Sequence, residues 1–427
     1  MHRVRGWSLC RVLELRHRRA LMKDPGPSPL PREQPSIPAG ISTPVSLTDR
    51  VPLLDSLRGF ALFGILVVNM WGFKVPLAAG DPTGLYIPGG LNEAAHLLIN
   101  VFANAKFLPI FSFLFGLGLV LQNNRSGSCS QGPRKLLVRR MTVFLGLGFI
   151  HGIVLWPGDI LMIYSLFGFG ALWFQQLGPR TLCNAAVLLM VSIFACTYFL
   201  MGFAPEEIPK EEWRSAADQW VSAYRLASPI GVIPLRIQEW FQWWIMGLFY
   251  HIPYALSFFL LGIAAGKSNI LFRLDTFLPH AMGHLKWSLP LGVVLSLLGP
   301  AYHRGFLPPF PDDARLITAA FLICPTLLAL SYLTGAAYIF HRGHLSSLAS
   351  VLADAGRMSL TNYLLQSVIA NVIFMGFGFY GRTSVSQGLV FSILIFTLQL
   401  FFSRWWMRHH KTGPVEAVVR KIIYPST

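Results

Sequence analysis

Charged residues are scarce in this chain. Asp, Glu, Lys and Arg make up only 13% of its 427 residues, about half of their share in an ordinary soluble protein. Hydrophobic residues make up 53%, so most of the chain must face lipid or other helices. This composition excludes a soluble enzyme, a disordered scaffold and a small disulfide-stabilised secreted domain. It predicts an all-α polytopic membrane protein.

Cysteine and acidic residues are also few. The five cysteines form no C-x-x-C pair and no zinc spacing, so we expect neither disulfide chemistry nor a structural metal. The 19 acidic residues are outnumbered by 35 basic ones, which gives a net charge of +16. In a soluble protein this balance would indicate nucleic acid, but in a membrane protein it is typical of cytoplasmic loops. We therefore expect the lipid bilayer as a partner and no nucleic acid.

Ten apolar runs are long enough to cross a bilayer core, which needs about 20 helical residues. They lie near 56–73, 97–121, 137–156, 160–177, 183–203, 240–266, 287–302, 316–340, 358–379 and 386–403. The seventh run is the weakest, because Pro290 and Pro300 interrupt it. The sixth contains Pro253, where we expect either a kink or a first segment that lies in the membrane interface.

The basic residues are distributed unevenly between the two sides of these predicted spans. With both termini in the cytoplasm, 25 of the 35 lysines and arginines fall on the inner side. Loops rich in Lys and Arg stay in the cytoplasm, so the sequence predicts about ten transmembrane helices with both termini cytoplasmic.

Four segments follow from this topology. Residues 1–50 are basic and then proline-rich, without the apolar core of a secretory signal; we expect a disordered cytoplasmic tail, with an organellar transit peptide as the alternative. Residues 51–204 form an N-terminal transmembrane half, and 236–427 form a C-terminal transmembrane domain. Between them, 205–235 is an amphipathic, acidic loop that the topology places outside the cytoplasm.

Polar groups within a membrane span are costly, so they are functional candidates by default. Asp55 and Arg58 are three residues apart and can pair at the cytoplasmic end of the first span. Asn69 lies eleven residues beyond Arg58, three helical turns, and returns to the same face. With Leu62 and Ile65, these residues form a stripe that faces one partner or cavity. The alternative is an ion pair that only fixes the end of the helix.

The third span repeats this spacing. Arg140 and His151 are eleven residues apart, on one face and about 16 Å apart along the axis. Arg140, together with Arg139, lies at the cytoplasmic end, and Asp159 opens the next span after a short turn. The spacing allows His151 to act as a general base or transient acyl carrier whose ring Asp159 orients. The alternatives are a packing histidine and an aspartate that caps the fourth span.

Four other polar residues lie within or beside the spans. His96 lies near the outer start of the second span, roughly level with His151, and is a candidate helper of the base. Lys106 lies deeper and needs a carboxylate, carbonyl or water partner. Asn362 belongs to the ninth span and Arg357 directly precedes it; hydrogen bonding between helices is the favoured interpretation there, and substrate contact the alternative.

Five ordered motifs are characteristic as a set. They are Asp55-Ser-Leu-Arg58-Gly59, Lys106-Phe107, Arg139-Arg140 with His151 and Gly158-Asp159, Gly356-Arg357-Met-Ser359-Leu-Thr-Asn362-Tyr363, and Gly413-Pro414-Val-Glu416. This set resembles the YeiB-like family of bacterial inner-membrane proteins over about 50–427. The C-terminal half is similar to that family's conserved domain of unknown function. The resemblance implies a multi-pass protein of the cell inner (plasma) membrane.

The YeiB-like family in turn resembles transmembrane acyltransferases such as heparan-α-glucosaminide N-acetyltransferase, through the D-x-x-R-G opening of the first span. This implies no tightly bound cofactor, acyl-CoA as a cytoplasmic co-substrate, and an envelope glycan or lipid-linked acceptor. His151 would be the base, aided by Asp159 or His96. The residues expected to bind substrate or donor are Asp55, Arg58, Asn69, Lys106, Arg139, Arg140, Arg357 and Asn362. The alternative is a transporter or permease for a small polar or amphipathic solute.

Overall fold

The computed structural model describes residues 51–79, 90–125, 132–201, 210–228, 230–303 and 314–424, and these residues form helices and no strand. The predicted tail, 1–50, lies outside the described residues. The elements are α2 (Pro52–Lys74), η2 (Leu77–Ala79), α3 (Gly90–Phe102), α4 (Phe107–Arg125), α5 (Pro133–Ile150), η5 (His151–Leu155), α6 (Leu161–Phe174), α7 (Pro179–Met201), α8 (Lys210–Leu226), α9 (Val232–Phe249), α10 (His251–Lys267), η6 (Ile270–Arg273), α11 (Leu274–His303), α12 (Ala314–His341), α13 (Ser346–Arg357), α14 (Ser359–Asn371), η7 (Val372–Gly376), α15 (Val385–His409) and α16 (Pro414–Ile423).

Six of the described helices are long and apolar enough to cross a membrane. They are Pro52–Lys74, Gly90–Asn123, Pro133–Leu155, Pro179–Phe199, Ile270–Leu298 and Val385–His409. Two bent pairs raise the number to as many as eight: α9 with α10, bent by 58°, and α13 with α14 and η7, bent by 79°. The chain is therefore a multi-pass, all-helical membrane protein, and the expected number of ten spans is not confirmed. The fourth predicted run contains only the 14 residues of α6, fewer than a full crossing needs.

Two of the predicted runs are interrupted: the second where no break was expected, and the sixth at another position than the expected one. The second run is interrupted between α3 and α4, where Ala105 adopts a left-handed conformation with φ of 61°. The sixth bends at Tyr250, whose φ and ψ of −134° and −67° are not helical. Pro253 lies in the first turn of α10, where a missing N–H costs little, so the bend does not occur at the proline.

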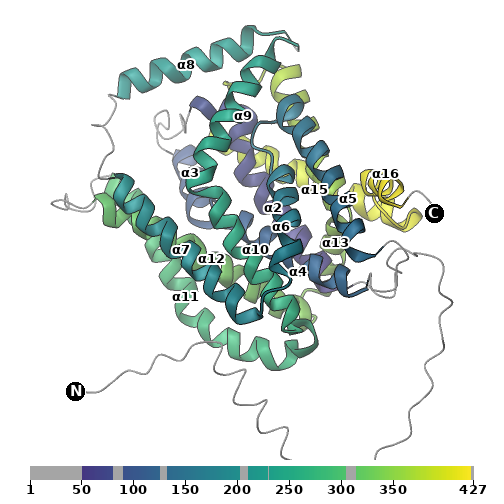
Figure 1. Cartoon of the computed structure of the whole chain (residues 1–427). Helices are drawn as coiled ribbons and strands as arrows, with labels where there is room; N and C mark the ends of the chain where they lie inside the picture. The colour runs from purple at the N-terminus through teal and green to yellow at the C-terminus, as the bar shows by residue number, and fades with distance from the viewer. Residues whose placement is uncertain are drawn as a thin grey trace, which may run out of the picture.

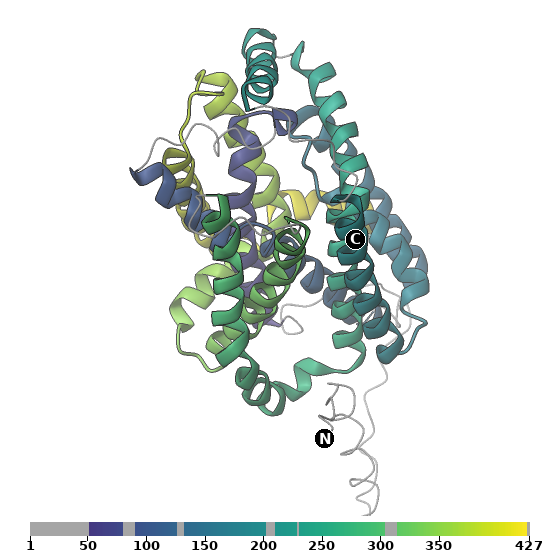
Figure 2. The ribbon, with the colours of Figure 1, turned by 90° about the vertical axis from the view of Figure 1, so that its left-hand side faces the viewer.

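Most helices run roughly along one common direction, with α2 near the centre of the bundle and α8 across its upper end (Figures 1 and 2). The described part of the predicted loop 205–235 is mainly α8, which buries Ala217 and Tyr224 and exposes Glu211 and Glu212. One face of this helix is therefore covered while its acidic face is open.

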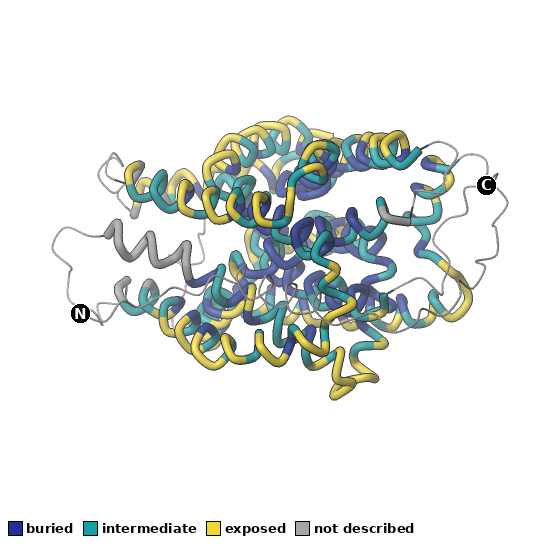
Figure 3. Tube along the Cα trace, turned by 60° about the horizontal axis from the view of Figure 1, so that its bottom comes forward, coloured by how far each residue is buried: buried dark blue, intermediate teal, exposed yellow. Residues whose placement is uncertain are grey.

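Large apolar side chains are exposed on the outer helices. Those on α7, α9 and α15 include Val187, Leu188, Val191, Phe199, Phe241, Met246, Val390, Leu394, Leu398 and Phe401. Figure 3 shows buried residues in the middle of the molecule and exposed ones on its outer turns. An exposed apolar surface of this extent is typical of a surface that faces lipid.

The central helix α2 packs against α13 almost backbone to backbone. A Cβ placed on Gly59 of α2 would lie 2.1 Å from the carbonyl oxygen of Leu352, and one on Gly356 of α13 would lie 1.9 Å from the carbonyl oxygen of Asp55. Small residues allow this close approach, which replaces the hydrophobic driving force that is absent between helices in lipid. The contact holds the bend between α13 and α14 against the start of α2.

The substitution Gly59→Ala tests this contact. The new methyl group has no room beside Leu352, so we expect α13 to move and the free energy of unfolding to fall by about 1–3 kcal/mol. Thermal unfolding of the purified protein in detergent measures the change. The matched control is Gly146→Ala in α5, where a Cβ would meet open space and stability should stay the same or rise slightly. Equal stability of the two variants would contradict the predicted clash.

Candidate functional site

His151 lies where α5 changes from an α-helix into the π-helical turn η5. Trp156 N donates to the carbonyl of His151 over 2.8 Å and closes this turn, after which the chain reverses to Asp159 and α6. A π-helical turn is rare and often occurs at a functional site, because it rotates one side chain away from the regular helical position. Here it directs the imidazole into the interior, where the residue is only 2% exposed.

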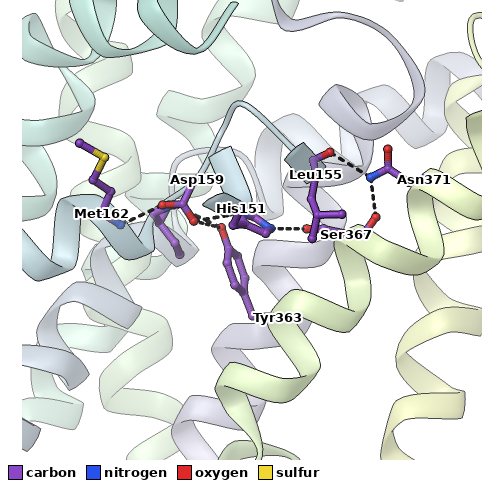
Figure 4. A network of polar contacts seen from close by, with 8 residues as sticks. His151, Leu155, Asp159, Met162, Tyr363, Ser367 and Asn371 are labelled. Atoms are coloured by element: carbon purple, nitrogen blue, oxygen red, sulfur yellow. Dashed lines mark hydrogen bonds and ion pairs between the residues drawn. The ribbon is translucent and has the colours of Figure 1, made fainter. Parts of the chain in front are cut away.

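The imidazole is bonded at both nitrogens (Figure 4). Nδ1 lies 2.8 Å from Asp159 Oδ1, and Nε2 lies 2.8 Å from Ser367 Oγ. Asp159 and Ser367 are fully buried. The three side chains therefore form a continuous Ser–His–Asp chain of hydrogen bonds between the η5–α6 turn and α14.

Asp159 both orients His151 and caps α6. Its Oδ2 accepts a hydrogen bond from Met162 N at 2.8 Å in the first turn of the helix, and its Oδ1 accepts from Tyr363 OH at 3.4 Å. Tyr363 OH in turn accepts from Ile160 N at 3.2 Å. The two functions predicted as alternatives for this aspartate are thus geometrically compatible, since each uses a different carboxylate oxygen.

Asn371 and Arg236 extend the network beyond Ser367 by hydrogen bonds to the backbone of η5 and α14. Asn371 Nδ2 donates to the carbonyl oxygens of Leu155 and Ser367, at 2.9 and 2.7 Å. Arg236, from α9, donates to the carbonyl of Val154 and to Asn371 Oδ1. These bonds join α9, η5 and α14 around the histidine.

Sequence reasoning missed four members of this network: Tyr363, Ser367, Asn371 and Arg236. A signal was present in α14, because the first three are spaced four residues apart and so lie on one face of the helix. No comparable signal marks Arg236, which comes from a distant helix.

A cavity of about 390 Å³ lies on the other side of Tyr363, between the first turns of α2 and α14 and parts of α4, α5, α6 and α16. Its charged lining residues are Asp55, Arg58, Arg140, Arg357, Glu416 and Arg420. Ile160, Tyr164 and Tyr363 also line it, and Tyr363 OH contacts both Ile160 N and Asp159. The Tyr363 ring lies 5.1 Å from the His151 ring, centroid to centroid, so one side chain separates the basic cavity from the buried histidine.

Four residues of the predicted stripe on α2 line this cavity: Asp55, Arg58, Leu62 and Ile65. Arg58 donates to Asp55 Oδ1 at 3.0 Å, as the spacing predicts. Asn69 does not line this cavity.

The remaining arginines of the cavity come from distant segments. Arg140 donates to Gln122 Oε1 and lies over the Phe144 ring, 5.2 Å from its centroid. Arg357 lies 3.7 Å from Asp354. With Arg58 of α2 and Arg420 of α16, the folded bundle thus gathers guanidinium groups from four separate helices at one cavity.

The other expected site residues lie outside both the cavity and the network. His96 bonds Asn100 in its own helix, and both nitrogens of His151 are occupied by other groups. Lys106 is 2% exposed and donates to the carbonyl of Asn100 at 2.6 Å, which identifies the kind of partner that it needs. Arg139 is half-buried and does not line the cavity.

Asn362 connects helices, in agreement with the favoured interpretation. Its Nδ2 donates to Ala355 O at 3.2 Å and to Ser403 Oγ at 2.9 Å, and it is fully buried. Within the described ranges, no group of three His, Cys, Asp or Glu residues could hold a metal ion.

Comparison with known proteins gives a family and several bacterial relatives. The profile of a protein family of unknown function, DUF418, matches residues 265–426. Uncharacterized protein YxaH of Bacillus subtilis is 31% identical over 404 residues, which cover 90% of this chain and 96% of the relative. An uncharacterized 39.9 kDa protein in the amylase 3' region of Bacillus acidopullulyticus is 30% identical over 391 residues, 89% of this chain and 96% of that protein. Uncharacterized protein YeiB of Escherichia coli is 28% identical over 402 residues, 88% of this chain and 96% of YeiB.

The substitution Asp159→Asn tests the double use of the carboxylate. One carboxylate oxygen becomes an amide NH₂, which can donate but not accept a hydrogen bond. It then faces either the N–H of Met162 or the N–H of the imidazole, so two donors oppose each other. We expect the free energy of unfolding to fall by about 1–3 kcal/mol, the cost of a buried polar group left without a partner. Thermal unfolding in detergent measures it. Asp275→Asn is the control, because its side chain is 82% exposed and its loss should stay within about 0.5 kcal/mol. An unchanged Asp159→Asn protein would refute this account of the network.

Proposed function

Because the chain belongs to the YeiB-like family, whose members YxaH and YeiB match it over most of its length, we propose that it is a membrane-embedded acyltransferase. It moves an acyl group from a cytoplasmic acyl-CoA-like donor to an envelope glycan or lipid-linked acceptor. The observation that carries this proposal is the contact at Tyr363. This residue lines the arginine-rich cavity and also bonds the carboxylate that orients a buried histidine.

The cavity has the chemistry of a site for an anionic donor. Arg58, Arg140 and Arg357 line it, and guanidinium groups bind phosphate oxygens in a bidentate manner. The lining also contains apolar residues such as Leu62, Ile65 and Phe111, which suit the uncharged part of a thioester donor. In the proposed arrangement the phosphates lie among the arginines and the acyl end points toward Tyr363.

The network supplies a proton acceptor next to Tyr363, which lines this cavity. Asp159 holds the His151 ring in one orientation through Nδ1, so Nε2 is the nitrogen that takes a proton. General-base assistance of this kind contributes about 10²–10⁴-fold to a rate. His151 is the proposed base and Asp159 its orienting partner. Asn69, His96, Lys106, Arg139 and Asn362 have no part in this proposal, because they lie outside the cavity and the network.

The proposed topology has ten spans and cytoplasmic termini in the cell inner membrane. Counting α6 and α12 as spans, in addition to the six long helices and the two bent pairs, gives ten. The distribution of basic residues then favours the cytoplasmic side for the beginning of α2 and for α16, which both border the cavity. The helix α8 belongs to the opposite side, where the acceptor would arrive.

Two substitutions separate chemistry from donor binding. His151→Gln removes the titrating nitrogen but keeps a hydrogen-bonding side chain, so kcat should fall by about 10²-fold or more. Arg140→Gln removes a phosphate partner, so the KM for the donor should rise while kcat changes little. Release of free CoA from acetyl-CoA, with glucosamine and N-acetylglucosamine as acceptors, measures both on the purified full chain in detergent.

The matched controls are His280→Gln and Arg342→Gln, which change exposed residues and should leave both constants unaltered. A stable His151→Gln protein with full turnover would end the catalytic assignment. Uptake of a solute by wild-type proteoliposomes, without any release of CoA, would favour the alternative of a transporter.

Reporter fusions test the orientation. A reporter fused after Thr427 should give the signal of a cytoplasmic position, and one inserted within α8 should give the signal of the opposite side of the membrane. The reason is that the predicted basic loops lie on the inner side. A fusion within the segment 343–345, between α12 and α13, serves as an internal control that should match the C-terminus. A cytoplasmic signal from α8 would overturn the orientation and the donor-side assignment of the arginines.

A further inference from the structure

The hydrogen bonds of Asp159 determine which nitrogen of His151 carries a proton. Both carboxylate oxygens face donors: Met162 N at Oδ2, and Tyr363 OH and His151 Nδ1 at Oδ1. An ionised carboxylate can only accept hydrogen bonds, so Nδ1 is the protonated nitrogen of the neutral ring. The lone pair of the imidazole is then at Nε2.

Among the residues that the structure describes, the hydrogen-bond partner of Nε2 is Ser367 Oγ, at 2.8 Å. Because Nε2 of the neutral ring is an acceptor, the serine hydroxyl must be the donor. The proton of Ser367 therefore points at a base whose far side is held by a carboxylate. This is the connectivity by which a base activates a serine nucleophile.

Both nitrogens of His151 are thus occupied, and the group that the ring can activate is Ser367. We propose that Ser367 is the nucleophile of the reaction and carries the acyl group as a serine ester. This inference rests on the proposed acyltransferase function and deepens it, because it replaces direct transfer between donor and acceptor by two steps through the enzyme.

The acyl group reaches the acceptor in two steps. Ser367 Oγ attacks the carbonyl carbon of an acyl thioester, the C–S bond breaks, and the serine proton passes through His151 Nε2 to the departing thiolate. In the second step a hydroxyl or amine of the acceptor attacks the serine ester. Its proton passes through Nε2 to Ser367 Oγ, which is released. Asp159 stays ionised throughout and stabilises the imidazolium that forms in each step.

The site is positioned to receive a thioester from the cavity. Tyr363 lines the cavity, and Ser367 follows it by four residues on α14, a rise of about 6 Å. A donor whose phosphates contact the arginines would bring its thioester to Ser367 by displacing the Tyr363 side chain. The fitting substrate class is therefore an acyl thioester that has an anionic end and a slender, uncharged arm.

The competing explanation is that Ser367 only satisfies the second nitrogen of a buried histidine, since buried polar groups need partners. Covalent labelling separates the two. The purified full-length protein is incubated with radiolabelled acetyl-CoA without an acceptor, quenched in acid and digested. We expect label on the peptide that contains Ser367 in the wild type, and none in Ser367→Ala or His151→Gln.

Turnover and a second nucleophile sharpen this test. Ser367→Ala should lose at least about 10²-fold in kcat, whereas Ser288→Ala, which changes another buried serine bonded to Ser331, should keep label and turnover. Ser367→Cys retains a nucleophile of similar size, so it guards against misfolding of the alanine variant. It should form a thioester that neutral hydroxylamine cleaves. Thermal unfolding of each variant confirms that the proteins compared are folded.

The possible results of these assays decide whether Ser367 is the nucleophile. If Ser367→Ala or, should that variant not fold, Ser367→Cys transfers the acetyl group to the acceptor and releases CoA at the wild-type rate without label at position 367, the serine is not the nucleophile. The proposed acyltransferase function then stands, with His151 acting directly on the acceptor. If the wild type releases CoA but carries no serine label, the inference fails in the same way. If the wild type neither releases CoA nor becomes labelled, both the proposed function and this inference fail.

Discussion

The structure depends on the requirement that a buried imidazole have partners for both of its nitrogens. His151 meets this requirement with Asp159, eight residues away, and with Ser367, which is 216 residues away. Leaving either nitrogen unpaired inside a membrane protein would cost a few kcal/mol, so this pair of bonds fixes α14 against the η5–α6 turn. Three other features hold the His151 side chain in the same place. They are the π-helical geometry of η5, the chain reversal at Asp159 and the hydrogen bonds of Arg236 and Asn371.

Helix α14 also joins the network to the arginine-rich cavity. Its first residues, Ser359 and Leu360, line the cavity, Tyr363 separates the two, and Ser367 and Asn371 belong to the network. One rigid helix thus spans from the charged groups to the histidine. The start of this helix is capped from a distance, because Glu416 of α16 accepts from Leu360 N and Thr361 N at 2.8 and 3.0 Å. Met358, at the N-cap, has no side chain that could do so.

The sequence predicts the features that depend on neighbouring residues. Hydropathy indicates the helices, the spacing of three residues indicates the Asp55–Arg58 pair of α2, and the short turn after His151 indicates its pairing with Asp159. The spacing of eleven residues did not bring Asn69 to the cavity. Features that depend on contacts between distant segments were not predictable. A single serine in an apolar helix gives no sign that it will meet a histidine 216 residues earlier. The bend after Arg357 has no proline within it, and it is stabilised by Gly356 against α2 and by Glu416.

The same distinction explains why four of the five residues in the predicted α2 stripe line one cavity while His96 and Asn362 proved unrelated to it. A helical face is a local property, so residues that share it also share their surroundings. Equal depth in a membrane is not a local property, because two groups at one depth can lie on opposite sides of a bundle. His96 was expected near His151 only on the ground of depth, and its ring bonds Asn100 within α3. In a polytopic protein, spacing along one helix is therefore stronger support for a common site than depth shared by two helices.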